Sequence, residues 1–365
     1  MGIVRVLLAI SVVLAHSTAI LGTTLFGGRT AVECFFVISG FYMAMVWSGR
    51  YSKGGNWWTF MASRLARLLP VYLIILIASA STSFLAVALG STTGFTETFD
   101  ALSISGKIVT IASNVTLIGQ DWLTFTAVGS NGFPVVMADP LSAPNRGAGL
   151  LLVPQAWSIS IELAFYVLAP FILRLSTKKL IVLGLGSLAI RAVLAMVGLD
   201  VDPWTYRFFP AELIYFVLGA IAFRITRDSL RPPGWLGPML LALLIIIGVL
   251  WSSLRDALPL IEPLFPFLFA FAVPYFFAWT KRNRQDRWIG ELSYPLYLVH
   301  MLVAQVLSAV GLQVNGLTLS VTSLVAAAGI LVVVAAPLEK LRQRRLAQTF
   351  AKAIQAPQAP SSPST

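Results

Sequence analysis

Arg5 and His16 lie inside a run of apolar residues that extends from residue 3 to residue 21. On an α-helix, eleven steps of 100° return the second side chain to within about 20° of the first, about 16 Å further along the axis. One helix face would therefore carry a cation near one end and an imidazole well inside. Histidine titrates close to neutral pH and suits general acid–base catalysis, and ionisable residues inside a membrane span usually have a function.

A second apolar run, from residue 30 to residue 47, contains Glu33 and Ser39. Glu33 can orient the imidazole of His16 and stabilise its cation, as the carboxylate of a catalytic triad does, or it can pair with Arg29 at the membrane surface. Ser39 can donate a hydrogen bond to a substrate or to its own backbone. We predict that His16 and Glu33 form a site where the first two spans meet.

The composition defines the class of protein that must hold these groups. Of the 365 residues, 57% are hydrophobic and 11% are charged, whereas about 25% are charged in a soluble domain. The sequence predicts an all-α polytopic membrane protein with one membrane domain, 1–345, followed by a disordered tail, 346–365. The single cysteine, Cys34, excludes an internal disulfide and a cysteine-rich metal site, and no metal site is predicted.

Ten apolar stretches are long enough to cross a bilayer. They cover residues 3–21, 30–47, 68–89, 150–173, 179–198, 207–224, 236–252, 259–279, 289–311 and 317–337. The apolar segment 105–119 is short and rich in Ser, Thr and Asn. We therefore expect it to lie within a long loop, 90–149, without crossing the membrane.

Lysine and arginine predict the orientation of these spans. The loops on one side, together with the C-terminal tail, hold most of the 26 Lys and Arg residues. The opposite side holds Arg29, Lys107, Arg146, Arg207 and Arg255, and with them Glu97, Asp100, Asp121, Asp139, Asp200, Asp202, Asp256 and Glu262. Both ends of the chain are therefore expected in the cytoplasm. Because the net charge of +11 follows this topology, we expect no nucleic-acid partner.

This topology leaves a set of ionisable residues at membrane depth. They are His16, Glu33, Glu162, Arg191, Glu212 and His300, with Arg64 and Arg67 at the cytoplasmic end of the third span. Each buried charge must find a partner or water, so the set favours a functional cavity over isolated pairs between helices. Glu162 can pair with Arg191 or polarise a substrate.

Five motifs follow one another along the chain. They are Arg5 and His16 with ten residues between them; Glu33 followed by the run Phe35–Phe41; Arg64–Pro70, of the form RxxRLxP; Trp157–Glu162, which follows the form WSLxxE with Ile in place of Leu; and Ser293–His300, of the form SYxLYLxH. In these motifs the chain resembles the acyltransferase-3 family of integral membrane acyltransferases. Two departures are the Glu at position 33, where Asp is commoner, and the lack of an SGNH-type esterase sequence after the last span, so a stand-alone member is expected.

The resemblance implies transfer of an acyl group, usually acetyl, from cytoplasmic acyl-CoA to a hydroxyl of an extracytoplasmic glycan such as exopolysaccharide or lipopolysaccharide. It implies an inner-membrane protein without a permanently bound cofactor, since acyl-CoA is a substrate. On this interpretation His16 and Glu33 are catalytic. The residues that bind acyl-CoA are Arg5, Arg64 and Arg67, since arginine suits phosphate. Further site candidates are Ser39, Glu162, Tyr294 and His300.

Two other functions fit some of the same residues. One is a proton-coupled transporter, in which His16 and the membrane acids relay protons, and the other is a non-catalytic partner in glycan or lipid export. Transporters of this kind often carry inverted repeats and helices broken at matching positions, and the sequence shows neither. For the enzyme, both direct transfer with His16 as general base and an acyl group carried on His16 stay open, as do the acceptor, the choice of acetyl or succinyl, and the oligomeric state.

Overall fold

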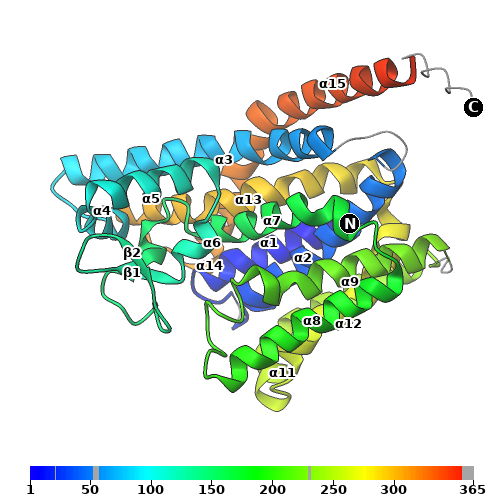
Figure 1. Ribbon diagram of the computed structural model, residues 1–365, viewed down its shortest axis with the longest axis horizontal. Helices are drawn as coiled ribbons and strands as arrows, with labels where there is room; N and C mark the ends of the chain where they lie inside the picture. The colour runs from blue at the N-terminus through cyan, green and yellow to red at the C-terminus, as the bar shows by residue number, and fades with distance from the viewer. Residues whose placement is uncertain (21, 52–56, 229–231, 356–365) are drawn as a thin grey trace, which may run out of the picture.

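Long helices lie side by side along the long axis of the molecule, and a group of short elements covers one end (Figure 1). The computed structural model describes residues 1–20, 22–51, 57–228 and 232–355. The bundle consists of α1 (Gly2–Ala15), α2 (Gly27–Val46), α3 (Trp57–Ala88), α7 (Trp157–Ile172), α8 (Thr177–Met196), α9 (Phe209–Asp228), α10 (Leu236–Val249), α11 (Trp251–Ala257), α12 (Ile261–Thr280), α13 (Arg284–Ala309), α14 (Gly316–Ile330) and α15 (Ala336–Gln355). The predicted all-α architecture is confirmed.

Eight helical segments in the described part of the chain are long and apolar enough to cross a membrane. They contain α2, α3, α7, α8, α9, α12, α13 and the continuous segment from α14 to Arg345, and the pair α10 and α11, bent by 71°, passes the same test as one span. The chain is therefore a multi-pass membrane protein. The first predicted span is shorter than expected, since α1 has 14 residues, or about 21 Å against a hydrocarbon core of about 30 Å.

Helix α1 ends at Ala15, and His16 caps it. The apolar pattern that continues to residue 21 predicted that His16 lies inside the helix, which is wrong. The last turn tightens, because the backbone N–H of His16 donates to Val13 at 3.1 Å and that of Ser17 to Leu14 at 3.2 Å. Side chains near a helix end can take over its last carbonyls, and Ser17 Oγ donates to Val13 in the same turn at 3.2 Å.

Glycines bring α2 and α9 close together. A Cβ atom added to Gly40 would lie 2.0 Å from the carbonyl oxygen of Phe216, and one added to Gly219 would lie 1.9 Å from that of Val37. Membrane helices associate largely through such small residues, since lipid offers no hydrophobic driving force between them. The contact fixes α2, which carries several of the predicted site residues, against the centre of the bundle.

The loop region, residues 89–156, covers what we call the loop end of the bundle. Its elements are α4 (Gly94–Asp100), α5 (Ile104–Thr116), α6 (Gln120–Leu123), the antiparallel strands β1 (Thr126–Val128) and β2 (Pro134–Val136), in which Ala127 pairs with Val135, and the 3-10 turns η2 (Gly147–Leu150) and η3 (Pro154–Ala156). Ser160 of α7 donates a 2.7 Å hydrogen bond to Asp121 of α6, and burial raises the pKa of Asp121 above its ordinary value. This buried bond fastens the loop region to the bundle.

Within the loop region, α5 corresponds to the segment 105–119 that was expected not to cross the membrane. Its 13 residues extend about 20 Å, which is too short for a span. Ile104, Ile108, Ile111 and Val115 are exposed, and their spacing of three and four residues places them on one helix face. The helix therefore presents an apolar face away from the bundle.

The end of the chain continues the last span. Helix α14 passes through a π-helical turn, Leu331–Ala335, into α15, which extends away from the rest of the bundle (Figure 1). Arg342 of α15 donates to Ser63 of α3 at 2.6 Å. The backbone of 346–355 is helical, and residues 356–365 lie outside the described residues, where the disordered tail stays a prediction.

Candidate active site

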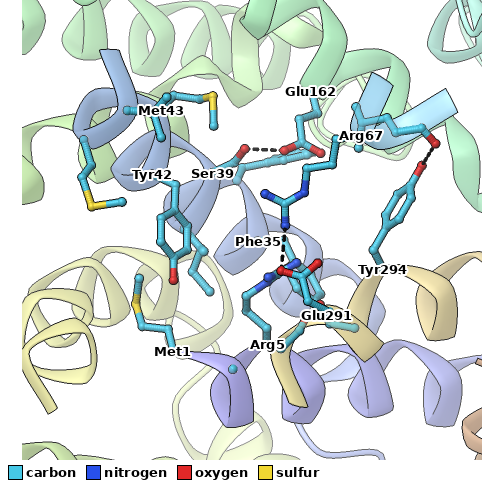
Figure 2. Close-up of a pocket in the computed structure, with 18 of the residues that line it drawn as sticks. Met1, Arg5, Phe35, Ser39, Tyr42, Met43, Arg67, Glu162, Glu291 and Tyr294 are labelled. Carbon is cyan, nitrogen blue, oxygen red and sulfur yellow. Dashed lines mark hydrogen bonds and ion pairs between the residues drawn. The ribbon is translucent and has the colours of Figure 1, made fainter. Parts of the chain in front are cut away.

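A cavity of about 820 Å³ lies among α1, α2, α3, α7 and α13, and no residue of the loop region lines it. Figure 2 shows side chains that line this cavity. Small-molecule sites commonly have volumes of about 300–1,000 Å³. Cationic groups outnumber acids in its lining: the amino group of Met1, Arg5, Arg64, Arg67, Lys281, Arg287 and Arg342 face Glu162, Asp286 and Glu291. We call it the basic cavity, and its charge suits an anionic ligand.

The structure brings together the three arginines predicted to bind a donor. Arg5 has no hydrogen-bond or ion-pair partner among the described residues, and Arg64 is buried with its Nε unpaired. Arg67 lies 3.6 Å from Glu291, and both side chains keep about two fifths of their surface exposed; Figure 2 shows this pair above Arg5. An exposed ion pair such as that of Arg67 and Glu291 contributes little to stability, so a ligand can replace it. An unpaired buried charge is costly, so Arg64 gains from an anionic partner, and this cluster can receive phosphate groups.

Glu162 and Ser39 meet on the wall of the basic cavity. The hydroxyls of Ser39 and Tyr166 both donate to one carboxylate oxygen of Glu162 (Figure 2). Of the two roles expected for Glu162, pairing with Arg191 is wrong, since α7 directs the carboxylate into the cavity. Ser39 therefore contacts a carboxylate supplied by a helix far along the chain.

Tyr294 lines the same cavity from α13. Its hydroxyl donates to the backbone carbonyl of Leu68 at 2.8 Å. Leu68 follows Arg67 on α3, so this bond fixes α13 against the arginine-bearing turn. Tyr294 therefore lines the cavity and also holds α3 and α13 together at its wall.

His16 lines a second cavity, of about 500 Å³, between the bundle and the loop region. We call it the loop-end cavity. Nδ1 of His16 lies 2.8 Å from the carbonyl oxygen of Val12. A carbonyl can only accept, so Nδ1 carries the proton of the neutral ring and Nε2 keeps a lone pair. His16 is thus held in the tautomer that a general base requires.

His300 lies directly beside His16, with 5.0 Å between the ring centroids. Its Nδ1 lies 2.8 Å from the carbonyl oxygen of Tyr297, so the same argument places the proton there. The ring is fully buried, and its Nε2 has no partner among the described residues. A proton taken up by His16 would therefore create a cation next to an unused acceptor.

Glu33 points away from His16. Its buried carboxylate accepts from Arg29 Nε at 3.2 Å and lies 3.8 Å from Arg191, which also binds Glu212 at 2.5 Å. No hydrogen bond or ion pair joins Glu33 to His16 in the described part of the chain, so the predicted contact is wrong, and Glu33 pairs with Arg29 instead. His16 and Glu33 were predicted at similar depths in the membrane. Successive side chains on a helix point about 100° apart, so similar depth alone does not bring two side chains together.

The comparison with known families agrees with this arrangement. The acyltransferase domain model matches residues 1–339. The chain belongs to the acyltransferase-3 family. No curated protein and no solved structure gives a match. The matched residues include the loop-end cavity, all of the basic cavity except Arg342, and every helix from α1 to the start of α15, so the protein is a membrane acyltransferase.

In this acyltransferase, the two cavities share a wall. Val32 of α2 and Tyr297 of α13 line both of them. The Tyr297 hydroxyl donates to the carbonyl of Gln155 at 3.1 Å and lies 2.7 Å from Ser158 Oγ. The barrier between the arginine cluster and the His16 cavity is therefore a thin layer of side chains held by α2, α7 and α13.

Sequence reasoning missed several residues of the acyltransferase site. Glu291 belongs to a predicted span and Arg342 to the part of the predicted membrane domain that follows the last span, and nothing local marks them as cavity residues. Arg146 and Gln155, which line the loop-end cavity, lie in and after the long loop. Their signal was indirect: a basic residue inside an acidic loop, and an amide close to the WSLxxE motif.

Proposed function

We propose that this acyltransferase moves an acetyl group from acetyl-CoA, bound in the basic cavity, to a hydroxyl of a glycan bound in the loop-end cavity. One observation supports this above the others: the cavity with the arginine cluster and the cavity with His16 lie toward opposite ends of the bundle and meet at Val32 and Tyr297. An enzyme that joins substrates from two sides of a membrane needs such an arrangement. By the distribution of Lys and Arg, the basic cavity would face the cytoplasm.

The basic cavity suits a CoA thioester. The phosphates would bind Arg5, Arg64 and Arg67, because guanidinium groups bind phosphate oxygens through paired, charge-assisted hydrogen bonds. The volume of about 820 Å³ accommodates a nucleotide-sized ligand. The thioester end would extend toward Ser39 and the shared wall, where the cavity approaches its neighbour.

The loop-end cavity supplies the base. Nε2 of His16 would take the proton from the acceptor hydroxyl as its oxygen attacks the thioester carbonyl, and the CoA thiolate would leave and take up that proton. The sulfur–carbonyl bond breaks as the new ester bond forms, so no further reactant is required. The ring of His300 lies 5.0 Å from that of His16 between centroids, and its Nε2 is unpaired within the described chain. This Nε2 would stabilise the imidazolium of His16 by accepting a hydrogen bond from the new N–H.

A rapid-quench experiment tests this proposal. Purified protein in nanodiscs is mixed with acetyl-CoA labelled in the acetyl group, with and without a bacterial polysaccharide acceptor, and protein-bound label and free CoA are measured. Direct transfer predicts CoA release only with acceptor and no stoichiometric label on protein. His16→Ala should abolish transfer, and label that persists in Cys34→Ala but disappears in His16→Ala would make His16 an acyl carrier instead.

Replacing Arg64 and Arg67 together by Ala tests the donor site in the same assay. Each charge-assisted contact contributes about 1.5–3 kcal/mol, so the KM for acetyl-CoA should rise at least about tenfold. Arg282→Ala with Arg284→Ala is the matched control, because both side chains are exposed and neither lines the cavity. An unchanged donor KM in the folded Arg64 and Arg67 variant would contradict the assignment.

A further inference from the structure

The loop-end cavity has an unusual charge for its location. Its lining includes Arg29, Arg146 and Arg207 and, within the described chain, no Asp or Glu. The same side of the protein is predicted to hold five basic residues and a larger number of acids. Three of those five basic residues line this one cavity and none of the acids does, so the cavity is positive inside an otherwise acidic surface.

Two of the three arginines already have carboxylate partners. Arg207 binds Asp202 through two bonds, of 2.6 and 2.7 Å, and Arg29 binds Glu33 at 3.2 Å. The guanidinium of Arg146 is exposed and has no hydrogen-bond or ion-pair partner among the described residues. Arg146 is thus the cation of this cavity whose full bonding capacity is available to a ligand.

A second group in the same cavity also lacks a partner. Gln155 is 4% exposed, and its Oε1 is buried without a hydrogen bond, while its Nε2 is held by the carbonyls of Tyr297 and Leu298. A buried acceptor that stays unpaired costs free energy. The fixed Nε2 orients Oε1, which can therefore accept from a ligand hydroxyl.

Part of the remaining wall is aromatic. Trp157 and Tyr206 line the cavity with their ring centroids 4.8 Å apart. The guanidinium of Arg207 lies 4.8 Å from the Trp157 ring and holds it in place. Flat side chains of this kind supply apolar contact area together with a polar edge, which suits the face and rim of a sugar ring.

We propose that the acceptor is an anionic glycan, whose carboxylate or phosphate group binds Arg146 while a hydroxyl of the sugar bonds to Gln155 and another reaches His16. This inference rests on the proposed function and adds the chemical class of the acceptor. A guanidinium binds carboxylate and phosphate through the same paired geometry, so the experiment must separate the two sources of charge.

The experiment uses three oligosaccharide probes that have the same sugar backbone and differ only in their charged group. The first is a tetrasaccharide containing glucuronate, the second is its carboxyl-reduced neutral form, and the third is the neutral form carrying a 6-phosphate. Binding to the protein in nanodiscs is measured by calorimetry without donor, and acetyl transfer is measured with acetyl-CoA. We expect at least one charged form to bind about tenfold more tightly than the neutral form, since a charge-assisted contact is lost in the latter.

Arg146→Gln should remove this preference and leave the KM for acetyl-CoA unchanged. Arg255→Gln is the matched control, because this arginine is expected on the same side, is exposed and does not line the cavity. Equal binding of charged and neutral forms, or a preference that survives Arg146→Gln, would overturn the inference. Charge-selective binding that depends on Arg146 but is not followed by acetyl transfer would support a site for an anionic glycan and contradict the proposed function instead.

Discussion

Replacing Gly40 by alanine should lower both the stability and the activity of this acyltransferase. The added Cβ would lie 2.0 Å from the carbonyl oxygen of Phe216, whereas ordinary contact begins at 3.4 Å. The two helices α2 and α9 would therefore have to move apart by about 1.4 Å at this point. The obstacle is a backbone carbonyl, which cannot rotate away as a flexible side chain can. Overpacking of this kind typically costs about 1–3 kcal/mol, and we expect a value near the upper end.

The same displacement should reach the site. Ser39 precedes Gly40 on α2 and donates to Glu162 of α7, so a shift of α2 changes the wall of the basic cavity. A misplacement of about 1 Å near a reacting centre can lower a rate about 100-fold. We therefore expect Gly40→Ala to fold with a lowered unfolding temperature and to transfer acyl groups about 100-fold more slowly.

The assay combines thermal unfolding in detergent with the rate of acceptor-dependent CoA release. Gly186→Ala on α8 is the matched control, because a Cβ there has no atom within 4 Å, and it should behave as the wild type. Wild-type activity and unfolding temperature in Gly40→Ala would refute the close contact between α2 and α9 and the reasoning built on it.

Two other predictions concern the role of Ser39 and the orientation of the chain. Ser39→Ala should slow transfer less than His16→Ala does, because Ser39 holds Glu162 and takes no part in the proposed proton transfer; an equal loss of kcat would point to Ser39 as a nucleophile. In a Cys34→Ala background, single cysteines at Ser105 and Arg282 test the topology with a membrane-impermeant thiol reagent on intact cells. Only position 105 should be labelled, and labelling at 282 would reverse the proposed orientation.

Several features of the protein follow from local properties of the chain. Apolar length predicted most of the spans, although α1 is too short for one. The segment that forms α5 was predicted not to cross the membrane, and its 13 residues are too few for a span. The type and spacing of Arg5, Arg64 and Arg67 indicated a phosphate site, and the structure places all three in one cavity. These conclusions needed only residue chemistry and the geometry of a single helix.

Contacts between helices could not be predicted in this way. Ser39 and Glu162 are 123 residues apart, and His16 caps α1 while His300 belongs to α13, so only packing shows that they touch. Similar depth in the membrane suggested that Glu33 meets His16, but depth does not determine which face of a helix points where. The neighbouring Val32 lines both cavities, while Glu33, turned by about 100°, binds arginines.

The sequence by itself determined the class of protein, its membrane spans and the kinds of group at its site, because hydrophobic length and residue chemistry are local. Only the tertiary structure decided which groups meet: a carboxylate for Ser39, an imidazole for His16, and a shared wall between two cavities. These pairings depend on how the faces of helices distant in sequence turn toward one another, which is set by close contacts such as that of Gly40 with Phe216.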